Sequence, residues 1–401
     1  MSILRHKLFL AVALAHFTVD VFSNMGSVLV TELGKSMALT TGQIGLAIGT
    51  YQLIAATTQP LFGWLSDKIG SRWFGSLSVP WTVTFIALAV LTAQTTNNFF
   101  LFMILFGLGA VGSGAFHPQG AMHAATVVIR RAATATAIFF LFGQTGLAGG
   151  PFIAGLTLDY VGPAGIYLLA FSTIPLLLYI GYAMRGATDF QPAASSSTPS
   201  KQPVILADKV RWGAIGLLAL LISFRSWAFL GTVSFLPKVF QNMGWSPTSY
   251  GAITSIFWLA SGVAGVLAGN LADRWGRRQV VFITLLLGSI TLYFLPLNSG
   301  WLAFPLALIC GGLLGASHSI IVVIAQALLP GQKAFASGLT LGYIFGVGAL
   351  AVWGIGALAD TWGLTLVIQM GAGIGILSAL VALFLPATRE TPQPQPEGIP
   401  V

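Results

Sequence analysis

Five ionisable side chains interrupt long apolar stretches of this chain: His16, Asp20, His117, Arg225 and His318. A charged side chain near the centre of a bilayer costs at least about 2.5–3.5 kcal/mol, so such residues are rarely kept without a function. A carboxylate or an imidazole can take up and release a proton. A guanidinium can grip a carboxylate or a phosphonate through two parallel hydrogen bonds. These residue types therefore predict a path for protons and for a polar, anionic ligand through an apolar protein.

Asp20 is the candidate proton carrier, and His16 lies four residues before it on the same face of a helix, where it can share that proton. Asn24 extends the polar stripe by one more turn. Arg225 is the candidate anion receptor, and its proximity to Asp20 could switch the protonation of the carboxyl group. The alternative is a static ion pair between Asp20 and Arg225 that only fixes two parts of the protein together.

His117 and His318 can add hydrogen-bond donors to the anion site, although a satisfied contact between helices is an equally good interpretation of each. Further candidate ligand contacts, which packing between helices would also explain, are Asn24, Tyr51, Gln144, Trp258 and Tyr343. The histidines are too dispersed in sequence for a zinc site, and no phosphate-cradling loop or serine triad is found. We therefore predict no metal, no cofactor and no enzymatic activity.

The composition predicts which kind of secondary structure carries these residues. Of the 401 residues, 56% are hydrophobic and 7% are charged, against about 25% charged residues in soluble domains. A soluble enzyme and a disordered chain are excluded. Because a membrane span needs about 20 apolar residues, we predict an all-α polytopic membrane protein with twelve transmembrane helices. They lie near 7–30, 41–64, 73–94, 98–122, 132–158, 164–184, 211–238, 248–271, 279–297, 300–326, 334–358 and 364–386.

The twelve predicted helices form two halves. We predict an N-terminal six-helix bundle at 1–184, a cytoplasmic linker at 185–210, a C-terminal six-helix bundle at 211–388 and a disordered tail at 389–401, because the linker and tail are rich in Pro, Ser or Gln. With both termini in the cytoplasm, the outer loops hold only Lys35 and Lys238 among the loop Lys and Arg residues. This asymmetry predicts a multi-pass protein of the cytoplasmic (inner) cell membrane. The net charge of +8 thus reflects membrane orientation, not binding of nucleic acid.

The two halves repeat one another. The segment from Gly63 to Arg72 recurs from Gly269 to Arg278, each copy following the second helix of its half. The segment from Gly155 to Gly162, which contains Asp159, recurs from Gly356 to Gly363 with Asp360. The residues before His117 resemble those before His318. Such internal repeats are typical of secondary transporters.

The repeated loop motif, G-x-L-x-D-[RK]-x-G-x-[RK], resembles the loop signature of the major facilitator superfamily. In that family the loops act as a conformational latch between inward- and outward-open states, and the alternative is a charge cluster that only sets topology. The residues that match the latch are Gly63, Asp67, Lys68, Gly70, Arg72, Gly269, Asp273, Arg274, Gly276 and Arg277.

A glycine-rich stretch in the fifth helix, with Gly146, Gly150, Pro151 and Gly155, resembles the antiporter motif of proton-driven exporters in the same superfamily. An ordinary packing face of small residues is the alternative.

Several segments along the whole chain resemble the fosmidomycin-resistance branch of that superfamily. They include His16-Phe-Thr-Val-Asp20, Ala115-Phe-His117-Pro-Gln119 and Arg225-Ser-Trp227. Gln119 departs from the branch, where this position is often acidic, so a proton role there is in doubt. In the superfamily the first, fourth, seventh and tenth helices line the central cavity, and these helices carry the five ionisable residues.

The resemblance implies a secondary active transporter that works by alternating access. Its function would be proton-coupled efflux of a small polar or anionic compound, such as a phosphonate-type drug. The alternative is a proton-coupled symporter that imports a small organic anion. We expect a monomer whose partners are protons, a small-molecule substrate and the lipid bilayer, with no nucleic acid.

Overall fold

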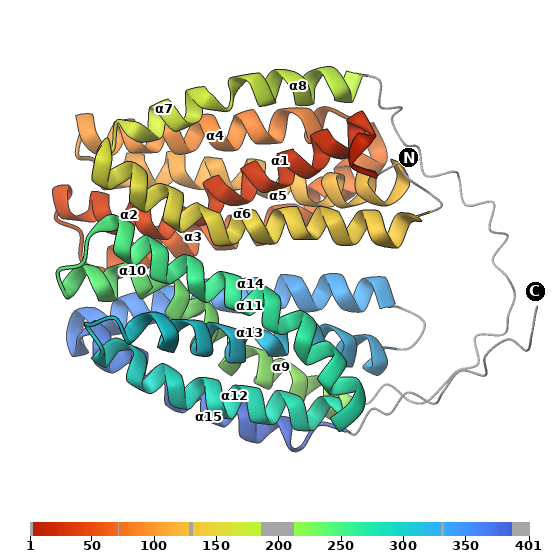
Figure 1. The fold of residues 1–401 in the computed structure, drawn as a ribbon, viewed down its shortest axis with the longest axis vertical. Helices are drawn as coiled ribbons and strands as arrows, with labels where there is room; N and C mark the ends of the chain where they lie inside the picture. The colour runs from red at the N-terminus through yellow and green to blue at the C-terminus, as the bar shows by residue number, and fades with distance from the viewer. Residues whose placement is uncertain (1–2, 71, 128–130, 186–211, 330–332, 387–401) are drawn as a thin grey trace, which may run out of the picture.

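The computed structural model describes residues 3–70, 72–127, 131–185, 212–329 and 333–386. The predicted linker at 185–210 and the predicted tail at 389–401 lie outside these residues, apart from Arg185. The described residues confirm the prediction of an all-α membrane protein in two six-helix halves (Figure 1). The first half holds α1 (Lys7–Asn24), α2 (Gly26–Ser36), α3 (Thr41–Ile69), α4 (Arg72–Thr95), α5 (Phe99–Val127), α6 (Ala132–Tyr160), α7 (Gly165–Ser172) and α8 (Ile174–Arg185). The second holds α9 (Trp212–Ser226), α10 (Thr232–Asn242), α11 (Pro247–Trp275), α12 (Arg277–Phe294), α13 (Ala303–Leu328), α14 (Lys333–Trp362) and α15 (Leu364–Ala382).

Eleven segments of the described chain are long and apolar enough to cross a membrane. Three of them combine shorter helices: α1 with α2, α7 with α8, and α9 with α10 through a π-helical turn at Trp227–Gly231. The twelfth long helix is α3, which carries several glutamines and threonines among its apolar residues. Of these, Gln52 contacts the other half, where its Nε2 donates to Ser234 Oγ (3.0 Å), and α3 as a whole packs against α14.

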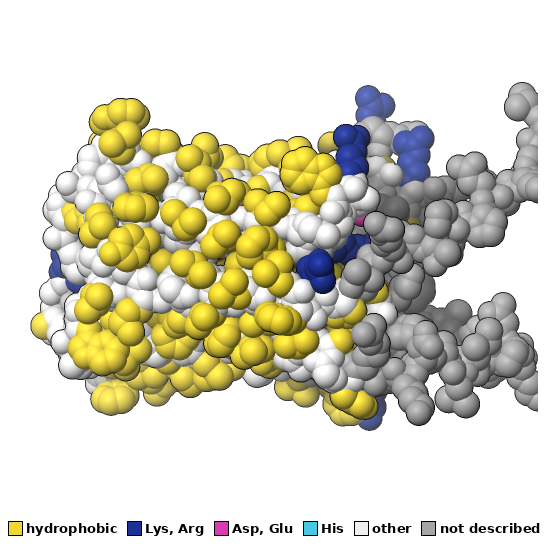
Figure 2. Space-filling view, turned by 90° about the horizontal axis from the view of Figure 1, so that it is seen from below, with side chains coloured by type: hydrophobic (Ala, Val, Ile, Leu, Met, Phe, Trp, Pro, Cys, Tyr) yellow, Lys and Arg dark blue, Asp and Glu magenta, His cyan; other side chains and the backbone are white. Residues whose placement is uncertain are grey.

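The outer surface explains why the chain belongs in a bilayer. Large apolar side chains are exposed along the helices, such as Leu178 (70% exposed) and Val266 (71% exposed). Figure 2 shows hydrophobic side chains spread over one whole face, with Lys and Arg gathered mainly at one end. Water would solvate such a surface poorly, whereas lipid matches it. The protein is therefore a multi-pass membrane protein.

The two halves meet most closely at the end of the molecule that lies opposite the two termini. We term it the closed end; it holds the connections at 37–40 and 243–246 (Figure 1). Here Asp360 Oδ2 accepts a hydrogen bond from the backbone N–H of Gly42 (3.0 Å), and Asp159 Oδ2 accepts one from that of Thr248 (2.8 Å). Both amides belong to the first turn of a helix, where N–H groups lack partners within the helix and favour a negative charge.

At the closed end, capping residues fix where α3 and α11 begin. Thr40 accepts from Gln43 N in a capping box, and Ser246 accepts from Ser249 N ahead of Pro247. Such N-capping side chains define the residue at which a helix begins. Since Asp159 and Asp360 occupy equivalent positions of the internal repeat, the same bridge between halves is made twice.

Backbones approach each other directly beside these bridges. A Cβ atom on Gly155 would lie 2.2 Å from the carbonyl oxygen of Pro247, and one on Gly251 would lie 2.4 Å from that of Pro151. Only glycine allows α6 and α11 to pack at this distance.

The repeated loop motifs lie at the opposite end and share one backbone geometry. Gly70 ends α3 with φ 93°, and Gly276 ends α11 with φ 96°. Residues with a side chain rarely adopt these angles, so both copies need glycine for the turn into the next helix.

Candidate functional site

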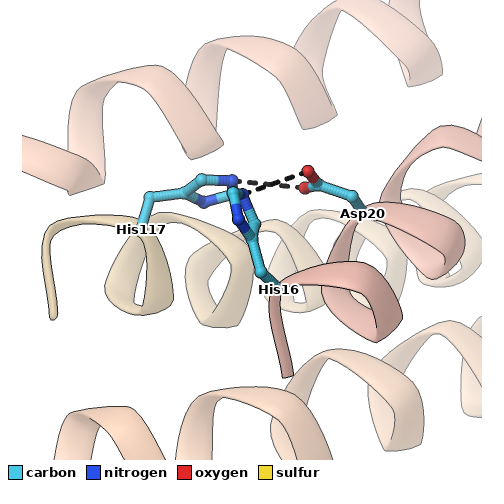
Figure 3. A group of neighbouring side chains, drawn as sticks. All are labelled: His16, Asp20 and His117. Atoms are coloured by element: carbon cyan, nitrogen blue, oxygen red, sulfur yellow. Dashed lines mark hydrogen bonds and ion pairs between the residues drawn. The ribbon is translucent and has the colours of Figure 1, made fainter. Parts of the chain in front are cut away.

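Three ionisable side chains meet inside the first half. His16 and Asp20 come from α1 and His117 from α5, and Figure 3 shows both imidazoles turned toward the carboxylate. His117 Nε2 lies 3.2 Å from Asp20 Oδ1, and His16 Nε2 lies 3.3 Å from Asp20 Oδ2. We term these three residues the His–Asp–His cluster.

The other ring nitrogens fix how the cluster is protonated. His16 Nδ1 donates to the carbonyl oxygen of Phe139 (2.8 Å), and His117 Nδ1 donates to that of Ser113 (2.7 Å). A carbonyl only accepts, so each Nδ1 carries a hydrogen and each Nε2 is left to face the carboxylate. An unprotonated Nε2 would turn its lone pair toward a carboxylate oxygen. Each of the two contacts is therefore favourable only when a proton or another cation lies there.

The three side chains of the cluster differ in how far they are exposed to solvent. The side chains of His16 and Asp20 are 4% and 6% exposed, whereas that of His117 is 26% exposed. His16 also stacks on Phe139, with ring centroids 4.0 Å apart. His117 is thus the member through which solvent reaches an otherwise enclosed carboxylate.

Glycines on α6 let α1 bring the cluster together. A Cβ atom on Gly143 would lie 2.3 Å from His16 Cε1, and one on Gly146 would lie 2.5 Å from the carbonyl oxygen of Phe17. Gly150 likewise faces the carbonyl of Val21 at 2.6 Å. Gly146 and Gly150 of the antiporter-like motif therefore pack on α1, which carries Asp20, whereas Gly155 of the same motif packs on α11.

The spacing of its ligand atoms bears on whether the cluster could hold a metal ion. One donor atom from each of its three residues lies within 4.8 Å of the other two. The sequence separates these histidines by about a hundred residues, and the fold brings them together. A structural zinc site has four protein ligands, one more than the cluster offers, whereas a zinc site with an open position needs three. The cluster can therefore hold a small cation. A proton is the simplest one, because it needs only a single hydrogen-bonded pair of atoms.

A chain of hydroxyl groups continues from the cluster. Tyr51 Oη donates to Ser23 Oγ (2.9 Å), Ser23 Oγ donates to Ser113 Oγ (3.1 Å), and the Ser113 carbonyl is the partner of His117. Tyr51 is 5% exposed, so in this conformation it is part of the interior of the first half. Asn24 Nδ2 donates to the carbonyl oxygen of Leu147 on α6. Sequence reasoning missed Ser23, although its place one turn after Asp20 could have revealed it.

Arg225 lies in the other half, near the end of α9, and is 1% exposed. Its Nε donates to Ser317 Oγ (3.2 Å), its Nη2 donates to the Leu314 carbonyl oxygen (3.5 Å), and its guanidinium lies 4.5 Å from the Phe229 ring centroid. Among the described residues, no carboxylate lies within ion-pair distance of Arg225. The structure does not bring it together with Asp20, because each group has its partners in its own half.

The remaining candidate contacts are dispersed over the molecule. Gln144 reaches the interface between the halves, with its Oε1 3.4 Å from a Cβ built on Gly262. In the second half, Trp258 packs edge-on against Phe229, the Tyr343 hydroxyl lies 2.9 Å from Ser223 Oγ, and His318 is half-buried near Phe345.

The candidate latch residues lie at the end of the molecule where the termini are. Lys68 Nζ sits 4.0 Å from the Trp64 ring centroid, and Asp273 and Arg274 are exposed. The side chain of Asp67 lies outside the described residues.

Comparison with known proteins agrees with this architecture. A family model described as Major Facilitator Superfamily matches residues 8–246 and 218–400. The chain is 28% identical to the uncharacterized MFS-type transporter YfnC of Bacillus subtilis (strain 168), covering 96% of this chain and 94% of that protein. It is 27% identical to the fosmidomycin resistance protein of Escherichia coli (strain K12), covering 94% and 92%.

A more distant relative is the putative multidrug resistance protein MdtD of Escherichia coli (strain K12), with 26% identity over 75% of this chain and 64% of that protein. Among solved structures, a bacterial homologue of the human lysosomal transporter Spinster superposes with a TM-score of 0.78 at 14% identity, covering 96% and 97%. A D-xylose–proton symporter superposes with a TM-score of 0.74 at 15% identity, covering 96% and 98%. At these identities the likeness of the structures concerns the fold.

Proposed function

The chain belongs to the major facilitator superfamily and is a membrane transporter, and on this premise we propose that it exports a small organic anion in exchange for protons. The observation that carries the proposal is the separation of charges between the halves. The His–Asp–His cluster in the first half needs cations, and Arg225 in the second half needs an anion.

The cluster supports coupling to protons because its two contacts can each take one. In the loaded form, a proton lies between Asp20 and each imidazole, so the cluster holds two protons. Loss of either leaves two lone pairs facing each other, which favours rearrangement of α1 against α5. His117 is the entry point, since it is the most exposed member.

Arg225 supports an anionic substrate because an unpaired buried guanidinium is costly until a negative charge compensates it. Phe229 and Ser317 hold the guanidinium in place without neutralising it. A phosphonate or carboxylate would supply both the charge and two acceptor atoms. Since Arg225 is covered in this conformation, substrate contact accompanies a movement of the halves.

Export is favoured over import by the relatives. Two of them are named as resistance proteins, for fosmidomycin and, putatively, for multiple drugs. With the termini in the cytoplasm, as the distribution of Lys and Arg predicts, the closed end faces outward and the conformation is open toward the cell interior. A symporter that imports an organic anion is the second candidate, since the packing of Gly146 and Gly150 on α1 gives those glycines a structural role in either direction.

The test uses purified protein in liposomes with a trapped pH dye, and a panel of phosphonates and small organic acids that includes fosmidomycin. We expect an imposed substrate gradient to drive protons the opposite way in the wild type. The Asp20→Asn variant should lose this proton movement and retain exchange of labelled for unlabelled substrate. Exchange also reports that the variant is folded. Undiminished proton movement in Asp20→Asn would refute the proton assignment, and proton movement in the same direction as the substrate would establish the symporter.

A further inference from the structure

The second half contains an apolar cavity of about 170 Å³ between α9, α13 and α14. Its walls include Leu218 and Ile222 from α9 and Ala325 from α13, and its only polar wall residues are Thr340 and Tyr343 from α14. Tyr343 is 39% exposed, so the cavity is not sealed. Apolar walls of this kind favour an apolar group over water.

The internal repeat shows what fills the corresponding place in the first half. Residues 117 and 318 are 201 positions apart, as are 155 and 356, so Phe139 on α6 corresponds to Thr340 on α14. Phe139 is 1% exposed and fills the corresponding space between helices of the first half, where it stacks on His16. Thr340 has no ring to place there. The first half therefore uses this space for its own proton site, and the second half leaves it empty.

The cavity and Arg225 both lie where α9 packs against α13. Ile222 lines the cavity, and Arg225 follows three residues later on the same face of α9, about 4.5 Å along the axis. On α13, Ala325 lines the cavity, and Ser317, which binds Arg225, lies two turns away on the same face. A ligand in the cavity is thus one helical turn from an uncompensated positive charge.

We propose that the cavity receives a single apolar group of the transported anion, about the size of a benzene ring, while Arg225 binds the anionic end. An apolar cavity of about 150 Å³ in another protein binds benzene, so a volume of about 170 Å³ admits one ring or a short branched alkyl group. The substrate class is then small amphiphilic anions, such as aryl phosphonates or aryl carboxylates. This inference rests on the proposed function, because it specifies the substrate of the same site.

The test compares phenylphosphonate with methylphosphonate, which share the anionic group and differ in the apolar one. Transport into liposomes is measured for the wild type, for Thr340→Phe, and for Leu341→Phe. Thr340→Phe adds to the second half the ring that the first half has at Phe139. Leu341→Phe adds a ring to the next residue of α14, which does not line the cavity and is 37% exposed.

We expect the wild type and Leu341→Phe to prefer phenylphosphonate at least about tenfold in kcat/KM, the usual range for filling an apolar pocket. Thr340→Phe should lose this preference and still transport methylphosphonate, which also shows that it is folded. Equal kcat/KM for both anions in the wild type, or an unchanged preference in Thr340→Phe, would overturn the inference and leave the proposed function standing. Transport of neither anion by the wild type would overturn this inference, and the same result across the wider panel of phosphonates and organic acids would refute the proposed function as well.

Discussion

Glycines let α6 and α11 approach closely at the closed end, and replacing one of them should open it. Gly251→Ala on α11 places a Cβ atom 2.4 Å from the carbonyl oxygen of Pro151 on α6. Backbone atoms of a helix cannot move aside as a flexible side chain can. Gly265→Ala is the matched control, because it lies on the same helix and a Cβ there meets nothing within 4 Å.

The size of the effect follows from the comparison of the two variants. Both substitutions favour the helix by about 0.8–1.0 kcal/mol, and this gain is the same whether the halves are together or apart. Only Gly251→Ala adds overpacking, which typically costs about 1–3 kcal/mol. That cost applies to the closed arrangement alone. The ratio of open to closed molecules should therefore rise about 5- to 150-fold in Gly251→Ala and stay unchanged in Gly265→Ala.

The assay is a distance distribution between two spin labels, one on each half at the closed end. Tyr160 and Trp301 are suitable positions, since they are 82% and 76% exposed. The chain has a single cysteine, Cys310, which is buried, so a Cys310→Ala background leaves only the two engineered cysteines to react. A new population at longer distance in Gly251→Ala, absent from Gly265→Ala, is the expected result.

Identical distributions in the two variants would refute the reasoning. That outcome would mean that the approach of α6 to α11 does not hold the halves together. A melting temperature measured for both variants separates an opened protein from a misfolded one.

Further outcomes are expected from the same structure. Replacing both Asp159 and Asp360 by Asn should weaken the closed end by about 0.5–1 kcal/mol for each exposed carboxylate, seen as a partial shift in the same spin-label distances. Arg225→Lys should raise the KM for a phosphonate about tenfold and Arg225→Gln roughly 100-fold, since Lys keeps the charge but not the two-pronged geometry; equal values would argue against a direct contact. Gly143→Ala should displace the His16 ring and reduce proton movement more than substrate exchange, measured in liposomes. A reversal-potential titration should give two protons moved per transport cycle, one for each contact of the His–Asp–His cluster.

The fold could be predicted from the sequence because its signals are strong and repeated. Long apolar stretches mark the spans, and the paired motifs that contain Asp159 and Asp360 mark the duplication. The helix α3 shows the limit of hydropathy alone, because a helix that packs among protein neighbours can carry glutamines and threonines.

The candidate site was predictable only within single helices. The spacing of His16 and Asp20 places them on one face of α1, and the structure puts His16 Nε2 3.3 Å from the carboxylate. That His117 joins them, and that Arg225 instead binds Ser317, depends on how neighbouring helices are rotated and shifted. Such registers arise from packing between segments a hundred residues apart, which periodicity along one chain does not report.

The bridges at the closed end place unequal demands on the sequences of their two sides. Asp159 and Asp360 bind backbone amides, and every helix start offers such amides whatever its side chains are. A substitution at Thr248 by any residue except proline keeps the amide that makes the bridge, whereas loss of either aspartate removes one bridge outright. Across related chains, the donating loops can drift in sequence while the two aspartates stay fixed, so the contact survives divergence that would separate a pair of complementary charges.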